Sequence, residues 1–297
     1  MPPDVKLDVC FFCYRGTGHG PLIRLQSMLQ YTRNHGVPDI YQTPDIYQSF
    51  VSHALIHVAR NAALSRIRPD ATHVLMMDDD MVAEDDAIVR LLENDEPVVS
   101  ALTTNRIPPI HLIPQVWDGS LERYLPMESV NLKRPVTGNF AVGGAFLLLR
   151  RDAIDALVND YLTAGDWMRE QHRMFDRMAV KRDHREREQR RRAEKRQFRY
   201  NLFKELRIFN FPVDDDEAEL SEDFALSDKI RALGFKTTID GTVRIGHMGE
   251  YPFGVWDIFY REELQKLIRE DCDYDPRQFM PANVRAMFDE ILREKAA

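Results

Sequence analysis

The chain has 297 residues, of which 44% are apolar, and its formal net charge at pH 7 is −8. This length suits one large domain, or a domain with an elaborate appendage, and the apolar content suffices for a sizeable core. The acidic balance argues against a general nucleic-acid binder but leaves room for a local basic face.

In chain order, apolar runs alternate with stretches of helical spacing through the first hundred residues. This alternation predicts right-handed crossovers and a mostly parallel sheet flanked by helices, an α/β fold. In such sheets ligands bind beyond the carboxyl ends of the strands. The expected strands are 5–13, 72–77 and 97–104, and the expected helices are 22–34, 52–67 and 84–94.

The second part of the chain is richer in β-type patterns before it turns helical. We expect strands over 110–117, 138–149, 236–240 and 242–247, and helices over 150–162, 224–235, 255–270 and 282–295. Gly234 is the expected end of the helix over 224–235.

Residues 166–205 contain no Gly or Pro, and their charges are strongly biased. Within 181–199, ten Lys or Arg face four Asp or Glu, a local net charge of +6 that leaves −14 on the rest. In several pairs, such as Asp183 and Arg187, an acidic residue is followed four residues later by a basic one, which favours a long solvated helix. The alternative is a basic arm that binds a polyanion or a partner subunit.

The three cysteines, Cys10, Cys13 and Cys272, are few and odd in number, which favours a reducing compartment. The first two have CxxC spacing in an apolar run, and we favour two buried strand thiols over a redox or zinc site. The N-terminus lacks the pattern of a secretory signal, and the longest apolar-rich run, 140–149, is far shorter than the roughly 20 residues that span a bilayer. We therefore expect a cytoplasmic protein with no membrane span.

A triplet of acids, Asp78, Asp79 and Asp80, follows the apolar residues 74–77 directly. Solvated loop acids explain residues 84–86, which start the next helix, but they explain the triplet poorly because it adjoins a strand too apolar to be exposed. Adjacent carboxylates in a partly dry site repel one another unless a cation neutralises them. Mg²⁺ and Mn²⁺ prefer such oxygens and combine them with substrate phosphates, so the triplet favours a metal–diphosphate site.

An acidic triplet at a strand end of an α/β sheet resembles the D-x-D motif of the GT-A glycosyltransferases. Four further segments are similar to elements of the family-2-like members, in the expected order: ARNAAL at 59–64, GNFAVGGAFLLLRRDAI at 138–154, SEDFALSDKIRALGFKTTID at 221–240 and RIGHMGE at 244–250. The closest likeness is to the small transferases often carried by phages, which would place the protein in the host cytoplasm.

The resemblance implies a Rossmann-like GT-A domain over 1–250, including the charged insertion near 166–205, and a helical extension over 251–297. It implies transfer of a sugar from a nucleotide-diphosphate donor, with UDP-sugar preferred, to an acceptor hydroxyl with the help of Mn²⁺ or Mg²⁺. Asp80 and His247 would hold the ion, and Asp78 would assist it or contact the ribose. Asp79 would belong to the same site for the nucleotide-sugar donor, and of the three acids its role is the least defined.

Asp223 is the candidate general base if the reaction inverts the anomeric centre, with Glu222 as its neighbour or substitute. A carboxylate at a helix start is also a good cap, and Ser221 competes for that duty. If configuration is retained, Asp223 would position substrate instead. The remaining candidates for the nucleotide or sugar are Tyr14, Arg15, Arg60, Asn61, Arg106, Gly143 and Gly144.

Two other functions stay open. RGTGHGP after the first strand could indicate a sugar nucleotidyltransferase, although it lacks the glycine content and the basic residues of those loops, and it lacks the GK[ST] of a P-loop. The fold could also bind a nucleotide-sugar without catalysis. The acceptor is open too: the basic segment 181–199 suggests DNA that carries a hydroxymethylated base, while protein, glycan and lipid-linked acceptors stay possible. The oligomeric state is not indicated.

Overall fold

The computed structural model describes residues 4–12, 19–42, 56–105, 110–127, 131–163, 208–209, 221–248, 252–254 and 282. Several sequence-based predictions lie outside these residues: those for Cys13, for Tyr14 and Arg15, for Arg106, for the basic segment 181–199 and, except for residue 282, for the C-terminal helices. In the described part, no helix is both long enough and apolar enough to cross a bilayer.

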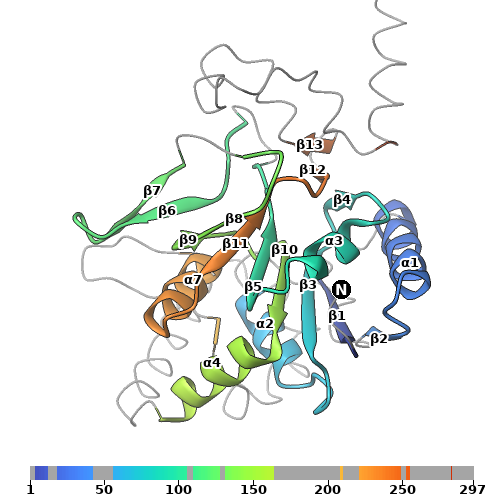
Figure 1. The fold of residues 1–297 in the computed structure, drawn as a ribbon, viewed down its shortest axis with the longest axis horizontal. Coiled ribbons are helices and arrows are strands. Elements are labelled where there is room, and N and C mark those ends of the chain that lie inside the picture. The colour runs from blue at the N-terminus through green and yellow to red at the C-terminus, as the bar shows by residue number, and fades with distance from the viewer. Residues whose placement is uncertain are drawn as a thin grey trace, which may run out of the picture.

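Seven strands form the central sheet in the order β2-β1-β3-β10-β5-β11-β8 (Figure 1). Their pairing directions place β1, β2, β3, β5 and β11 in one direction and β8 and β10 in the other. The expected mostly parallel α/β sheet is therefore confirmed. The strands are β1 Lys6–Phe12, β2 Asp39–Gln42, β3 His73–Asp78, β5 Val98–Ala101, β8 Val136–Gly138, β10 Phe146–Arg150 and β11 Thr237–Asp240.

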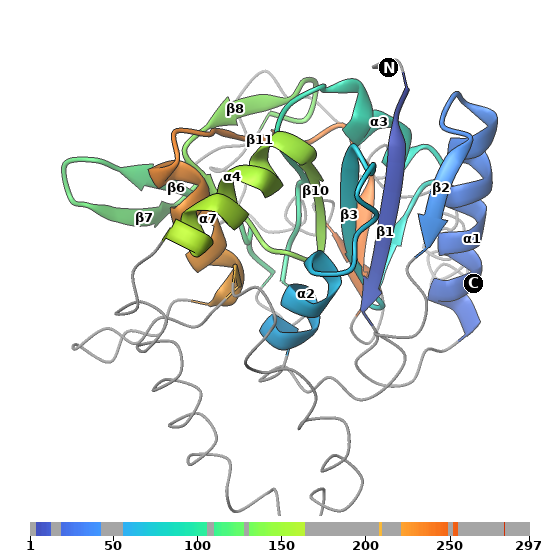
Figure 2. The same ribbon diagram turned by 90° about the horizontal axis from the view of Figure 1, so that it is seen from below.

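Five described helices cover the two faces of this sheet (Figure 2). They are α1 His19–Asn34, α2 Ile56–Leu64, α3 Ala87–Glu93, α4 Arg151–Thr163 and α7 Glu222–Ala232. The apolar residues of α1 and α3 join one core cluster, and those of α2, α4 and α7 join the other. The described part of the chain thus forms three layers, with helices on both faces of the sheet.

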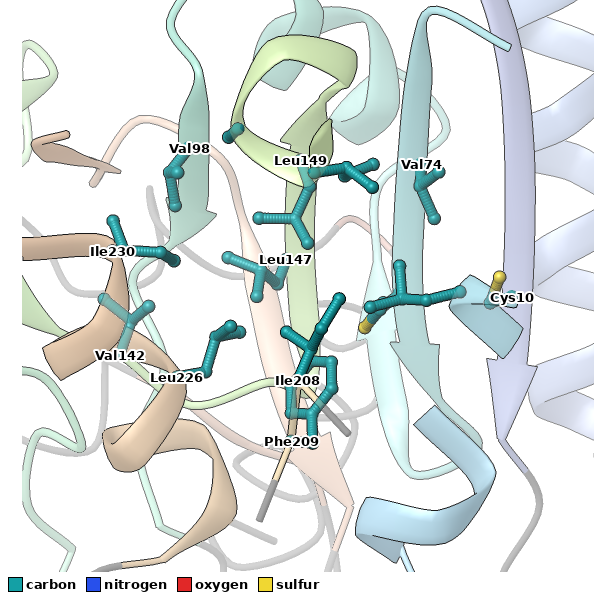
Figure 3. Packing of buried hydrophobic residues seen from close by; sticks show 14 of the residues in the cluster. Cys10, Val74, Val98, Val142, Leu147, Leu149, Ile208, Phe209, Leu226 and Ile230 are labelled. Carbon is teal, nitrogen blue, oxygen red and sulfur yellow. The ribbon is translucent and has the colours of Figure 1, made fainter. Parts of the chain in front are cut away.

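The two-residue period of the strands divides each buried strand between these two clusters. In β3, Val74 and Met76 face α2, α4 and α7, whereas Leu75 and Met77 face α1 and α3. Figure 3 shows side chains of the cluster that includes α2, α4 and α7, among them Cys10, which is fully buried, as expected for a strand thiol.

Two small antiparallel sheets lie outside the central one. One joins β4 Met81–Ala83, β12 Ile245–Met248 and β13 Pro252–Gly254, and the other joins β6 Gln115–Asp118, β7 Arg123–Pro126 and β9 Phe140–Ala141. The strand expected over 138–149 is thereby divided: β8 ends at Gly138, β9 follows, and β10 begins only at Phe146. The chain changes from one sheet to another here, which an apolar run by itself does not reveal.

The end of α7 agrees with the sequence-based expectation. The helix ends at Ala232, and Gly234 has a φ of +84°, a left-handed conformation that glycine adopts without steric cost. The nearby backbone N–H of Phe235 donates to the carbonyl of Ile230 and closes the end of the helix.

Candidate active site

Strand direction gathers the candidate residues at one edge of the sheet. β3 and β5 point the same way, so their carboxyl ends lie at the same edge, and the antiparallel β10 between them starts there. Asp78 is the last residue of β3, Asp79 and Asp80 follow it, Thr103 and Thr104 follow β5, and residues 143–144 precede β10. This is the edge at which α/β sheets bind ligands.

The two-residue alternation of side chains along β3 determines the direction in which Asp78 points. As the next even-numbered residue after Val74 and Met76, it faces the layer that contains α2. There Nη2 of Arg60 lies 3.2 and 3.3 Å from the two carboxylate oxygens of Asp78. Both residues are buried, with 2% of Arg60 and 6% of Asp78 exposed.

The same guanidinium reaches the start of α7. Nη1 of Arg60 donates to Oε1 of Glu222 at 2.7 Å, and Glu222 is also buried. Burial raises the pKa of Glu222 to about 7; the nearby charges of Asp223 and Asp78 add to this effect, and Arg60 opposes it. Two carboxylates therefore share one guanidinium, and Asp223 adds a further negative charge next to Glu222, which is an excess of negative charge in a mostly dry space.

Asp223 is more open than Glu222, and its carboxylate is held by local groups. Oδ2 accepts a hydrogen bond from the backbone N–H of Gly144 at 3.2 Å, and Oδ1 accepts from the hydroxyl of Ser221. Ser221 occupies the N-cap position, but its side chain makes no capping bond to the helix. Glu222 and Asp223 thus supply the negative charge that the positive N-terminus of α7 favours.

Asp80 meets His247 because β4 pairs with β12. In that antiparallel pair His247 is opposite Met81, and the backbone N–H of Met248 donates to the carbonyl of Asp80 at 2.7 Å. Nε2 of His247 lies 3.2 Å from Oδ2 of Asp80, and Nδ1 lies 2.9 Å from the carbonyl oxygen of Thr104.

The hydrogen bond to the Thr104 carbonyl determines the tautomer of His247. A carbonyl oxygen only accepts, so Nδ1 carries the proton, and in a neutral imidazole Nε2 then presents its lone pair to the carboxylate of Asp80. Two acceptors this close require a proton or a cation between them. Metal-binding histidines usually donate their other ring N–H to a carbonyl, a carboxylate or water in the same way.

The donor set fits a hard or borderline divalent ion. Two adjacent ligands of an octahedral ion at about 2.1 Å are about 3.0 Å apart, close to the observed 3.2 Å between Oδ2 of Asp80 and Nε2 of His247. Within the described ranges, no three His, Cys, Asp or Glu side chains come together as a metal cluster. The chain would supply Asp80 and His247, while Asp78 faces Arg60, and phosphates and water would complete the shell.

Asn61 lies next to Arg60 on α2 and binds a segment that the sequence did not single out. Its Oδ1 accepts from the N–H groups of Ile208 and Phe209 at 2.7 and 2.8 Å, and its Nδ2 donates to the carbonyl of Phe209 at 2.6 Å. Nζ of Lys229 donates to the remaining carbonyl, that of Ile208, at 2.6 Å. No sequence signal marks this anchor, because Asn61 is 147 residues from Ile208 along the chain.

The two candidate glycines have different surroundings. A Cβ at Gly144 would clash with the guanidinium of Arg60, with Cζ only 2.5 Å away. A Cβ at Gly143 would lie 3.3 Å from Ile113 and 3.7 Å from Oδ2 of Asp223, which is tight but not prohibitive. Asp79, the third acid of the triplet, is 9% exposed, and its N–H donates to the carbonyl of Phe12 at 2.8 Å.

No family model matches the chain, and a comparison with curated proteins found no match either. Among solved structures, the protein A197 from STIV is similar at 13% identity and a TM-score of 0.36, over 82% of this chain and 86% of that one. A glycosyltransferase involved in glycosylation of the major capsid of PBCV-1 follows at 12% identity, TM-score 0.28, over 50% and 62%. A mutant of Drosophila β1,4-galactosyltransferase 7 in complex with manganese, UDP-Gal and xylobiose has 14% identity and TM-score 0.28, over 52% of each chain. Likeness at this level assigns neither a family nor an activity.

Proposed function

We propose that the protein is a metal-dependent glycosyltransferase of the GT-A type that moves a sugar from a nucleoside-diphosphate donor to an acceptor hydroxyl. The observation that carries this proposal is the pair of Asp80 and His247 at the ligand-binding edge of the sheet, with the tautomer of His247 set by Thr104. Mn²⁺ or Mg²⁺ bound by this pair would stabilise the charge that develops on the departing nucleoside diphosphate.

The two acids at the start of α7 have separate roles in this proposal. Glu222 is buried and its carboxylate is bound to Arg60, whereas Asp223 is half-buried and keeps the better access to an incoming hydroxyl. Asp223 would accept the proton of the acceptor hydroxyl as that oxygen attacks the anomeric carbon, with inversion of configuration. The N–H of Gly144 holds Oδ2 of Asp223 in place.

The test combines a donor screen with identification of the product. Thermal unfolding is measured with Mn²⁺ and a panel of UDP- and GDP-sugars, because specific binding to the folded state raises the melting temperature by mass action. The donor that binds is then incubated with the protein and water or acceptor mixtures. Release of the nucleoside diphosphate supports the proposal, whereas formation of pyrophosphate from a nucleoside triphosphate and a sugar phosphate would support a nucleotidyltransferase.

For the acceptor, we propose DNA that carries a hydroxymethylated base, bound through the basic segment 181–199. The support is its local net charge of +6 in a chain of net −8. Binding through phosphates releases counterions, so DNA affinity should fall steeply as salt rises. Replacement of 181–199 by an uncharged linker should remove that affinity; retained affinity and an unchanged salt slope would contradict this acceptor.

A further inference from the structure

We propose that Arg60 is a positioning residue and not a nucleotide ligand: its guanidinium ties Asp78 at the end of β3 to Glu222 at the start of α7. One side chain would thereby hold the metal and nucleotide side of the site in register with the helix that carries Asp223. The catalytic part of this inference rests on the proposed function, whereas the structural coupling does not.

The first support is the enclosure of the guanidinium. Arg60 is only 2% exposed, and the absence of a side chain at Gly144 is what leaves room for its head group. A Cβ at Gly144 would lie 2.5 Å from Cζ and 2.9 Å from Nη2 of Arg60. A nucleotide cannot reach this head group without displacing the protein around it.

The second support is a pair of aromatic rings beneath the charge. Cζ of Arg60 lies 5.9 Å from the ring centroid of Phe12 and 5.6 Å from that of Phe209. Both rings are fully buried, so they exclude water and strengthen the ion pairs of Arg60 with Asp78 and Glu222.

The third support is the way in which Phe209 is fixed. Asn61 and Lys229 satisfy all four backbone polar groups of Ile208 and Phe209, and both apolar side chains pack into the core beside Leu226 of α7 (Figure 3). Asn61 is the chain neighbour of Arg60, so α2 supplies both the cation and the clamp for the ring beneath it. Phe209 and Gly144 are therefore positioning residues for Arg60.

The coupling is tested in the ligand-free protein by a double-mutant cycle. Arg60→Met, Glu222→Gln and the double variant are unfolded in urea with EDTA present. Each variant raises the equilibrium constant of unfolding by a certain factor relative to wild type. We expect the factor for the double variant to be at least about tenfold smaller than the product of the factors for the two single variants, because each single variant already breaks the same ion pair. The control is a cycle of Arg90→Met with Glu222→Gln, because Arg90 on α3 pairs with the N-cap residue Asp86 and not with Glu222. In this control cycle the factors of the two single variants should multiply. If the Arg60 cycle is also multiplicative, the proposal is overturned.

Two further variants keep the test decisive if Arg60→Met does not fold. Arg60→Lys retains the charge but reaches only one carboxylate, and it replaces Arg60→Met in the same cycle. Gly144→Ala should weaken the coupling between Arg60 and Glu222 although it changes neither residue. Gly119→Ala, where the nearest atom is 3.8 Å from the added Cβ, is the matched glycine control.

Kinetics with the donor identified in the screen separates positioning from nucleotide binding. For Arg60→Lys we expect kcat to fall at least about tenfold while the donor KM changes less than about threefold. A tenfold rise in KM with unchanged kcat would make Arg60 a nucleotide ligand and overturn the proposal. Absence of turnover by the wild-type protein with every donor would instead refute the proposed function, and the cycle in the ligand-free protein would still decide the structural coupling.

Discussion

At the scale of single residues, the candidate site contains more acidic side chains than basic ones. The buried guanidinium of Arg60 pairs with both Asp78 and Glu222, and Asp223 adds a negative charge next to Glu222. Asp80 faces His247, whose other ring nitrogen already donates to the carbonyl of Thr104. Both arrangements gain stability from an added positive charge, which is a proton at Glu222 and a divalent ion between Asp80 and His247 in our proposal.

The raised pKa of Glu222 predicts the sign of one pH effect. Between the ordinary pKa of 4.5 and the folded-state pKa of about 7, the folded protein binds this proton more tightly than the unfolded chain does. The contribution of Glu222 to the free energy of unfolding therefore falls as pH rises through this window and is constant above it. Gln does not titrate, so the Glu222→Gln variant lacks this contribution. The free energy of unfolding of the wild type minus that of Glu222→Gln, both measured in urea with EDTA, should therefore decrease from pH 4.5 to 7. A flat or rising difference would refute the prediction.

Substitution of Asp80 tests the ligand role of a single carboxylate. Asp80→Asn removes the charge but keeps the shape. We expect Mn²⁺ affinity to fall on the order of 100-fold, at least as much as the loss of a residue that only orients a metal ligand costs. Isothermal titration with Mn²⁺ and UDP measures this affinity. Asp70→Asn is the control, because Asp70 is an exposed acid that precedes β3 and pairs with Lys6. Equal Mn²⁺ affinity in the two variants would exclude Asp80 as a ligand.

At the scale of elements, strand direction and strand period determine which candidates can meet. The apolar runs and their alternation predicted the strands and the α/β class, because each buried strand is apolar on both faces. They also placed the acids 78–80 at the ligand-binding edge. The division of 138–149 into parts of three strands was not predictable, because it depends on which sheet each part joins.

The contacts within the site were only partly predictable, for a similar reason. Asp80 and His247 were expected together from the family resemblance, and the pairing of β4 with β12 brings them within 3.2 Å. Arg60 and Glu222 are 162 residues apart, and no local pattern relates them. The sequence makes Gly144 a candidate contact of the nucleotide or sugar, whereas the group nearest to its missing side chain is the guanidinium of Arg60.

The anchor between α2 and residues 208–209 gives an element-scale prediction. Asn61→Ala leaves three buried backbone groups of Ile208 and Phe209 without their partner, each at a cost of about 1–3 kcal/mol. We expect the free energy of unfolding to fall by at least about 3 kcal/mol in urea titrations. Asn34→Ala, at an exposed position on α1, should change it by less than about 0.5 kcal/mol. If the two variants were equally stable, Asn61 would not hold this segment.

At the scale of the whole molecule, ligand binding should be cooperative between metal and nucleotide. The described part of the chain offers two ligands, so phosphate oxygens would be needed to complete the coordination of the ion. UDP at about 100 times its Kd would add about 2.7 kcal/mol of stability, a rise of a few degrees in Tm. This rise should appear with Mn²⁺ and vanish in EDTA. A Tm rise of equal size in EDTA would show that UDP binds without a metal.

The central claim is that Asp80 and His247 hold a divalent ion, and pulsed electron paramagnetic resonance of Mn²⁺ tests it most directly. In the wild-type protein with Mn²⁺ and UDP, we expect electron spin-echo modulation from a directly bound histidine ¹⁴N and coupling to the ³¹P of the diphosphate. In His247→Gln the nitrogen modulation should disappear while the protein stays folded. Nitrogen modulation that persists in His247→Gln, or a wild-type Mn²⁺ spectrum without any histidine nitrogen, would contradict the account.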